Sequence, residues 1–104
     1  MSKQVIYIKK GDAGTFTETI TGISSLSGYT AKMYIYDFGK TLKTTITGSI
    51  NTLTAVYNIT NDTTKTYDIG TYYFETKIFD SSDHVYTQSN GLLIIEPANQ
   101  SDPS

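Results

Sequence analysis

Several residue types that carry chemistry are missing or rare in this sequence. The 104 residues include no cysteine and no tryptophan, and only one histidine. Without cysteine the chain has no disulfide, no thiolate metal site and no cysteine nucleophile. A Ser-His-Asp triad would have to use His84, which lies beside Asp83 at a predicted hairpin tip, and no serine stands out as its nucleophile. We therefore expect His84 to be an exposed loop residue and the protein not to be an enzyme.

Charge and long apolar runs are also scarce. The net charge is -2 and 17% of the residues are charged, which predicts no basic surface for nucleic acid or for an anionic membrane. No segment approaches the roughly 20 apolar residues that a membrane-spanning helix requires. The first apolar run ends at Lys9, Lys10 and Gly11, too early for a signal peptide. We expect a complete soluble protein, made in a reducing cytoplasm, with neither a nucleic-acid nor a membrane partner.

The acidic and glycine-rich positions form no recognisable cofactor or metal motif. Asp37, Asp80 and Asp83 fall near predicted strand ends, but they lack the Asp-x-Asp-x-Asp-Gly spacing of a calcium loop. Residues 9–14 include two glycines but no helix follows them, so a phosphate cradle is not expected there. We expect no catalytic, cofactor-binding or metal-binding residues.

The residues that are present favour β-structure. Threonine and tyrosine are abundant, and apolar and polar residues alternate with the period of two that is typical of strands. The length suits one domain with a modest two-layer core. The sequence predicts an all-β protein, an antiparallel β-sandwich of seven or eight short strands without a disulfide over residues 1–97, followed by a flexible polar tail over 98–104. Strands are expected at 5–8, 15–21, 29–37, 41–47, 53–59, 72–79 and 84–95.

Three interruptions of the alternation are predicted. Residues 48–51 are expected to form a turn. Asn61 or Asp62 could cap a single helical turn within the next break, so a short helix or a loop is expected there. A bulge or kink is expected at 89–91, inside the last strand.

One charged residue interrupts an otherwise apolar strand face. Glu18 shares a face with Phe16 and Ile20. It could mark the end of a face that opens to solvent, or it could be a charge on an edge strand that discourages aggregation. We prefer the second interpretation.

The segment Asp68-Ile69-Gly70-Thr71-Tyr72-Tyr73-Phe74 is the clearest fold marker. It matches the corner of immunoglobulin-like sandwiches, where a tyrosine hydroxyl bonds back to the loop before its strand. Tyr72 would supply that hydroxyl, and Asp68 would hold the turn by accepting backbone N–H groups. Gly70 would allow a backbone conformation that a Cβ would hinder. A simple turn before a tyrosine-rich strand is the alternative.

Phe74 stands two residues after this tyrosine, where antibody domains have their second cysteine. With no disulfide available, we expect Phe74 to face Met33 and Ile35 and to hold the two sheets together by packing. Burial of each such side chain contributes about 1.5–3 kcal/mol, so several can replace a covalent link.

Four aromatic residues fall on the strand faces opposite the predicted core. They are Tyr34, Tyr36, Tyr73 and Phe79. They could be ordinary half-buried strand residues that pair across strands. They could also form a subunit interface, where tyrosine is enriched, or stack on sugar rings. If they lie together, they form a possible interaction face of a kind that monomeric proteins seldom expose.

Six segments together resemble a known family. They are residues 10–17 (KGDAGTFT), 26–33 (LSGYTAKM), 55–60 (AVYNIT), 70–78 (GTYYFETKI), 80–86 (DSSDHVY) and 91–95 (GLLII). Over about residues 3–97 the chain resembles the immunoglobulin-like N-terminal domain of phage baseplate upper proteins, found in tailed phages of Gram-positive bacteria, and related virion proteins.

The resemblance implies a non-enzymatic structural protein of a virion, assembled in the host cytoplasm as a baseplate, tail or decoration component. Its partners would be other virion proteins or further copies of itself. Family members usually continue into a second region, whereas this chain ends after the sandwich, which favours a small accessory subunit or a single domain of a longer protein. The alternative function is a carbohydrate-binding or host-surface adhesion module that binds a glycan. The absence of tryptophan counts against it, because tryptophan offers the largest stacking face.

Overall fold

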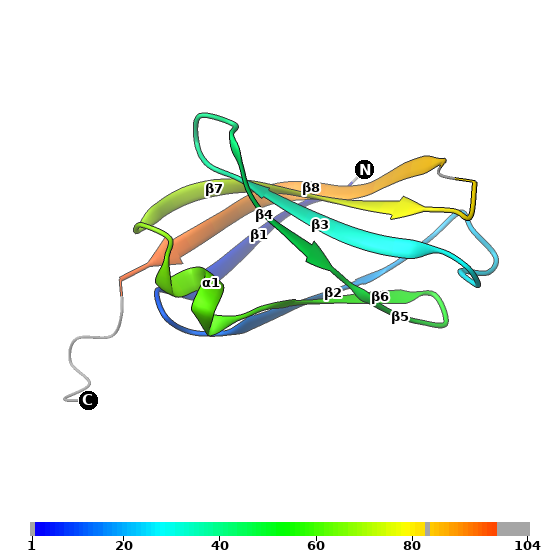
Figure 1. Cartoon of the computed structure of the whole chain (residues 1–104), viewed down its shortest axis with the longest axis horizontal. Helices are drawn as coiled ribbons and strands as arrows, with labels where there is room; N and C mark the ends of the chain where they lie inside the picture. Colours follow the sequence, from blue (N-terminus) through cyan, green and yellow to red (C-terminus); the bar gives the residue numbers. More distant parts are fainter. Residues whose placement is uncertain (1, 83, 98–104) are drawn as a thin grey trace.

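The computed structural model is a two-layer β-sandwich with one short helix at its end (Figure 1). It describes residues 2–82 and 84–97, so the tail predicted over 98–104 lies outside the described residues. The elements are β1 (Ser2–Lys9), β2 (Gly14–Thr19), β3 (Thr30–Tyr36), β4 (Leu42–Thr47), β5 (Ser49–Asn51), β6 (Thr54–Ile59), α1 (Asn61–Lys65), β7 (Gly70–Phe79) and β8 (Val85–Glu96).

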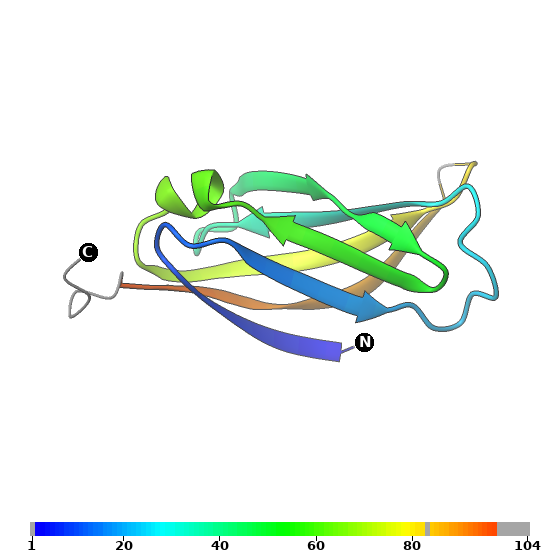
Figure 2. The same ribbon diagram turned by 90° about the horizontal axis from the view of Figure 1, so that it is seen from below.

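The strands form two sheets, and in Figure 2 the smaller sheet lies in front of the larger one. The larger sheet has the order β1-β8-β7-β3-β4, and the smaller has the order β2-β6-β5. All neighbours are antiparallel except β1 and β8, which run parallel. The expected sandwich is present, and the β1–β8 pair is where it departs from the antiparallel arrangement.

The core lies between the sheets and follows the alternation in the sequence. In β3, Ala31, Met33 and Ile35 are fully buried, while the residues that alternate with them are half-buried or exposed. Ala55 and Ile59 of β6 are buried from the opposite sheet. Alternate residues of a strand point to opposite faces, so one apolar face on each sheet is enough to build this core.

Phe74 holds the sheets together through a partner that the sequence did not indicate. Its side chain is 2% exposed. However, Met33 and Ile35 lie on the neighbouring strand of the same sheet, with Ile35 directly opposite Phe74, so they do not face it across the core. The residue across the core is Phe16 of β2, whose ring centroid lies 5.3 Å away in an edge-to-face arrangement. Such aromatic pairs add about 0.5–1.5 kcal/mol beyond the burial of their area.

The corner before β7 is tied by one hydrogen bond. The hydroxyl of Tyr72 donates to the carbonyl oxygen of Asp68 over 2.8 Å. The acceptor is the backbone of Asp68 and not its carboxylate, and the residue itself is exposed. Gly70 has a φ of 150°, a conformation that residues with a Cβ rarely adopt. Burial raises the pKa of the Tyr72 hydroxyl, and the nearby Asp68 carboxylate raises it further.

Local details differ from the sequence expectations in three places. Residues 49–51, expected as a turn, form β5, and the chain turns at Thr52, which has a φ of 58°. Thr60 caps α1 by accepting a hydrogen bond from the backbone N–H of Thr63, in the place expected for Asn61 or Asp62. The bulge in β8 falls at residue 88, because Thr76 pairs with Ser89 and the next pair skips one residue.

Glu18 lies on an edge strand, as we interpreted it, because β2 is an outer strand of the smaller sheet, but its side chain has a further role inside the molecule. It points between the sheets, where its carboxylate accepts hydrogen bonds from the hydroxyls of three residues on three other strands. These are Tyr57 at 3.2 Å, Thr76 at 3.1 Å and Ser89 at 2.6 Å. Burial raises the pKa of Tyr57, and the Glu18 carboxylate raises it further. The sequence did not reveal these bonds because the partners are distant along the chain. The bonds are what allows a carboxylate to point between the sheets, since a buried charge needs hydrogen-bond partners.

Candidate interaction face

The four aromatic residues singled out in the sequence lie on one surface of the molecule. Tyr34 and Tyr36 belong to β3, and Tyr73 and Phe79 belong to the adjacent strand β7. Each follows or precedes a buried residue, so all four point to the outer face of the larger sheet. Tyr36 pairs directly with Tyr73 across the two strands, whereas Phe79 lies at the far end of β7.

Lysine side chains cover the Phe79 end of this face. The Nζ atom of Lys77 lies 5.7 Å from the ring centroid of Tyr34, and that of Lys32 lies 5.8 Å from the ring centroid of Phe79. Lys77 also lies 3.5 Å from the carboxylate of Glu75. Cation–π contacts of this kind contribute about 0.5–1 kcal/mol at exposed sites. The rings in this half therefore already have partners within the chain.

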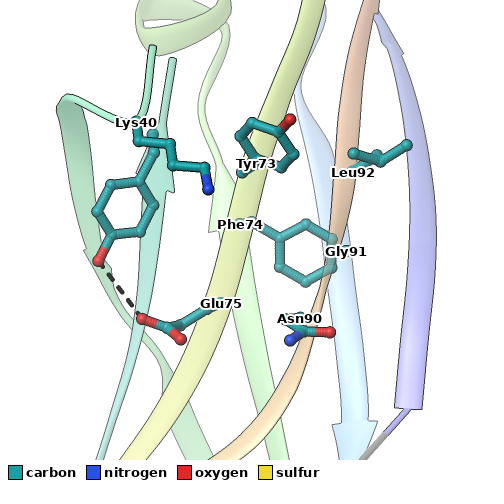
Figure 3. A pocket seen from close by; sticks show the side chains of 8 residues that line it. Lys40, Tyr73, Phe74, Glu75, Asn90, Gly91 and Leu92 are labelled. Carbon is teal, nitrogen blue, oxygen red and sulfur yellow. Dashed lines mark hydrogen bonds between the residues drawn. The ribbon is translucent and has the colours of Figure 1, made fainter. Parts of the chain in front are cut away.

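A hollow of about 370 Å³ opens at the other end of the face (Figure 3). It is lined by Tyr36, Lys40, Tyr73, Phe74, Glu75, Asn90, Gly91 and Leu92. At one side of the hollow the hydroxyl of Tyr36 donates to the Glu75 carboxylate over 3.4 Å. Burial raises the pKa of Tyr36, and Glu75 raises it further.

The aromatic ring at this hollow is already partly covered. Phe38, from the loop between β3 and β4, stacks on Tyr73 with centroids 5.6 Å apart and planes 16° apart. The Nζ atom of Lys40, from the same loop, lies 6.0 Å from the Tyr73 ring centroid. A sugar ring would have to share or displace these contacts in order to stack on Tyr73.

Sequence reasoning missed the apolar residues beside the hollow. Val5 and Tyr7 of β1 are 48% and 63% exposed, and they pair with Leu92 and Ile94 of β8. Leu92 in turn lies opposite Tyr73. The outer apolar patch thus consists of Val5, Tyr7, Phe38, Tyr73, Leu92 and Ile94.

A signal for this patch was present in the sequence. Residues 5–8 and 92–95 are runs of four apolar residues, without the polar alternation of the other strands. Such runs are typical of strands that are covered on both faces. Here one face of each run packs into the core and the other is only partly covered.

β1 is held against β8 by close backbone contact. Gly91 pairs with Gln4, and a Cβ added to Gly91 would lie 1.9 Å from the carbonyl oxygen of Gln4. Because that neighbour is backbone and cannot move aside, only glycine fits here. Gly91 therefore sets how closely the edge strand approaches the sheet.

The hairpin between β7 and β8 gathers the single histidine and two of its neighbours around Asp80. Its carboxylate accepts bonds from the backbone N–H groups of Ser82 and His84, at 2.8 and 2.9 Å, and from the Tyr86 hydroxyl. The Nδ1 atom of His84 lies 3.0 Å from it. Desolvation acts to raise the pKa of Asp80, but the backbone bonds and the imidazole together lower it. Asp83 lies outside the described residues.

Within residues 2–82 and 84–97, no three histidine, cysteine or acidic side chains gather in a way that could hold a metal ion. No helix in this part of the chain is long and apolar enough to cross a membrane.

Comparison with known proteins shows the fold. No family model matches the sequence, and no curated protein matches it. The fibronectin(III)-like modules of Clostridium thermocellum CbhA are similar in structure, with a TM-score of 0.58, 11% identity, and coverage of 95% of this chain and 94% of the module. CopC from Methylosinus trichosporium OB3b is also similar, with a TM-score of 0.57, 10% identity, and coverage of 95% and 88%. The chain is an immunoglobulin-like β-sandwich.

In antibody domains of this fold, a disulfide joins the second strand along the chain to the strand that begins at the tyrosine corner. In this immunoglobulin-like sandwich those strands are β2 and β7, and Phe16 and Phe74 meet between them. The outer face of the larger sheet is left with the hollow and the outer apolar patch as its distinguishing features.

Proposed function

We propose that this chain is a non-enzymatic assembly module that acts through protein–protein contacts of the larger sheet. The outer apolar patch carries the proposal, because its residues are contiguous across three strands and a loop and several remain largely exposed. Monomeric proteins seldom expose such patches, and aromatic residues are enriched where proteins meet. The polar chemistry of the described residues serves structure instead: Glu18 bridges strands, and Asp80 orders a hairpin.

The resemblance to the N-terminal domain of phage baseplate upper proteins supports a more specific role. We propose that the module is a structural component of a tailed-phage virion, in the baseplate, tail or decoration layer. Its partners would be other virion proteins or further copies of the chain. A small β-sandwich with the outer apolar patch suits that role, because virion subunits pack against their neighbours and need no catalytic site.

A carbohydrate-binding or host-surface adhesion module is the second candidate. The hollow favours it, since Lys40, Glu75 and Asn90 place polar groups around an aromatic ring. Aromatic rings flanked by polar groups are a common way to hold a sugar. The stacking of Phe38 on Tyr73 counts against it, because the contact occupies ring surface that a sugar would use.

Size-exclusion chromatography with light scattering tests the first candidate. We expect an oligomer whose mass does not change when sugars are added. The double substitution Leu92→Thr and Ile94→Thr should weaken association at least about tenfold, a change of about 1.4 kcal/mol. The matched control, Tyr34→Ser in the lysine-covered half, should leave it unchanged. A strict monomer that binds glycans on an array would overturn the assembly function.

The virion assignment has its own test. Mass spectrometry of purified phage particles should detect this chain at a fixed stoichiometry to the major tail proteins. A gene position within a tail-morphogenesis cluster is the corresponding expectation for the genome. If the gene lies among unrelated genes and the chain is absent from particles, the virion role is wrong, whereas the assembly function would still be judged by the chromatography.

A further inference from the structure

We propose that the open edge of β1 pairs with β1 of a second copy, so that two larger sheets join into one continuous antiparallel sheet. The inference rests on the proposed assembly function and adds a second contact to it: the partner is another copy of the chain, and the surface is the open edge of β1 beside the outer apolar patch. It is carried by the character of the edge and by the direction of the backbone groups in β1.

The two edges of the larger sheet differ in how well they are protected. Within the described residues, β1 has β8 as its only strand neighbour, and their register runs without a bulge. Its lysines, Lys3 and Lys9, lie near its two ends, and its middle, residues 5–8, has neither a charge nor a proline. At the opposite edge, β4 shows a register shift against β3 and exposes Lys43, Thr45 and Thr47. Bulges and charged side chains are the usual protection of an edge, so the middle of β1 is the stretch without either.

The backbone of β1 determines what kind of partner fits. The N–H of Lys10 donates to the carbonyl oxygen of Glu96 over 2.9 Å. In a parallel ladder, the backbone groups of alternate residues bond to the same neighbouring strand. The N–H and C=O groups of Ile6 and Ile8 therefore also point to β8. The N–H and C=O groups of Val5 and Tyr7 then point to the open edge, which lies at the margin of the molecule in Figure 2. An extended strand presents its own N–H and C=O groups at the matching spacing and can therefore pair with them.

A second copy of β1 is suited to be that strand. Antiparallel pairing about a twofold axis at Tyr7 sets each Val5 opposite a Lys9, so that no two lysines face each other. It also sets Tyr7 beside Tyr7 of the second copy, and cross-strand aromatic pairs are favourable. A twofold axis normal to the sheet keeps both outer faces on the same side, so the two outer apolar patches become one. An isologous contact of this kind closes at a dimer.

Cysteine cross-linking tests the register directly, because the chain has no cysteine of its own. Opposed residues of a hydrogen-bonded antiparallel pair have Cα atoms about 5.5 Å apart, within the range of about 4.4–6.8 Å that a disulfide spans. Tyr7→Cys should therefore give a covalent dimer on mild oxidation. Thr45→Cys, at the middle of the opposite edge, is the matched control and should stay monomeric on a denaturing gel. Absence of the Tyr7→Cys dimer, or equal dimer in the control, would contradict the pairing.

Proline substitution separates the open edge from the bonded side. Val5→Pro removes an N–H that faces the open edge and should leave the fold intact while weakening dimerisation at least tenfold. Ile6→Pro removes an N–H that β8 uses, so it should lower the thermal midpoint. An oligomer that survives Val5→Pro, without the Tyr7→Cys cross-link, overturns the edge pairing and leaves the assembly function standing. A monomer at millimolar concentration overturns the edge pairing, and glycan binding by that monomer overturns the assembly function too.

Discussion

The ring of Phe16 meets the ring of Phe74 edge to face, with their centroids 5.3 Å apart, and this contact joins the two sheets. It lies between the strands that carry the inter-sheet disulfide in antibody domains. On its other side Phe16 stacks with Tyr57, with their ring centroids 6.2 Å apart. Packing of aromatic rings thus connects the sheets without a covalent bond.

Removing this contact should strongly destabilise the protein. Phe74→Ala leaves a cavity at a side chain that is 2% exposed, and we expect the free energy of unfolding to fall by about 3–5 kcal/mol. Urea denaturation followed by tyrosine fluorescence measures the change. Phe79→Ala, at a half-buried position on the outer face of the same strand, is the control and should cost less. Equal losses for the two variants would show that Phe74 has no special role in joining the sheets.

The corner hydrogen bond should contribute a smaller amount. Tyr72→Phe removes only the hydroxyl that donates to Asp68, so we expect a loss of about 0.5–1.5 kcal/mol with the fold unchanged. The neighbouring Tyr73→Phe removes a hydroxyl on the outer face and should change the free energy of unfolding little. Thermal denaturation of both variants provides the comparison. If Tyr72→Phe were as stable as the unmodified protein, the bond would not contribute to the stability of the corner.

Some features of this fold could be read from the sequence and others depended on contacts distant along the chain. Alternation identified the strands, and the spacing around Tyr72 indicated the immunoglobulin-like fold, because both are local patterns. The partner of Phe74 could not be read, since sheet membership decides whether Ile35 lies beside it or across from it. The partners of Glu18 could not be read for the same reason, as they come from three other strands.

The candidate site shows the same limit. The aromatic residues of the outer face follow from alternation, whereas the lysines that cover Tyr34 and Phe79 follow from the pairing of β3 with β7. The apolar runs at 5–8 and 92–95 gave a sign of a second covered face. Their parallel pairing brings both runs to one place, and that pairing is a property of the topology.

Glu18 should prove necessary for the inner packing of the sandwich. Glu18→Ala removes the acceptor shared by the hydroxyls of Tyr57, Thr76 and Ser89, and a buried polar group left without a partner costs about 1–3 kcal/mol. Glu18→Gln keeps one acceptor oxygen and should lose less. Glu75→Gln on the outer face serves as the control. If Glu18→Ala proved more stable than the unmodified protein, the bonds would not repay the burial of the carboxylate.

Stability should decline in alkaline solution because of buried tyrosines. Burial raises the pKa of Tyr57, and Glu18 raises it further. The unfolded chain therefore releases this proton at a lower pH than the folded protein does. The contribution of Tyr57 is complete below about pH 10, the ordinary value for tyrosine, and is lost progressively above it. Urea denaturation at a series of alkaline pH values should show this decline.

The matched variant for the alkaline test is Tyr57→Phe, which should make the decline shallower. Burial also raises the pKa of Tyr67 and Tyr72, so part of the decline should remain in this variant. An ultraviolet titration of phenolate formation should show a group of tyrosines that ionise only when the protein unfolds. Identical pH profiles for Tyr57→Phe and the unmodified protein would remove Tyr57 from the explanation.

The parallel pairing of β1 with β8 has a mechanical consequence. Eight residue pairs, from Ser2 with Ser89 to Lys9 with Glu96, lie side by side in the same direction. A force that pulls Ser2 backward and Glu96 forward acts along these strands, so it loads the hydrogen bonds of the whole ladder in shear at once and cannot open them one after another. Tension applied to this sandwich between Ser2 and Glu96 would therefore be resisted by the β1–β8 ladder as a whole.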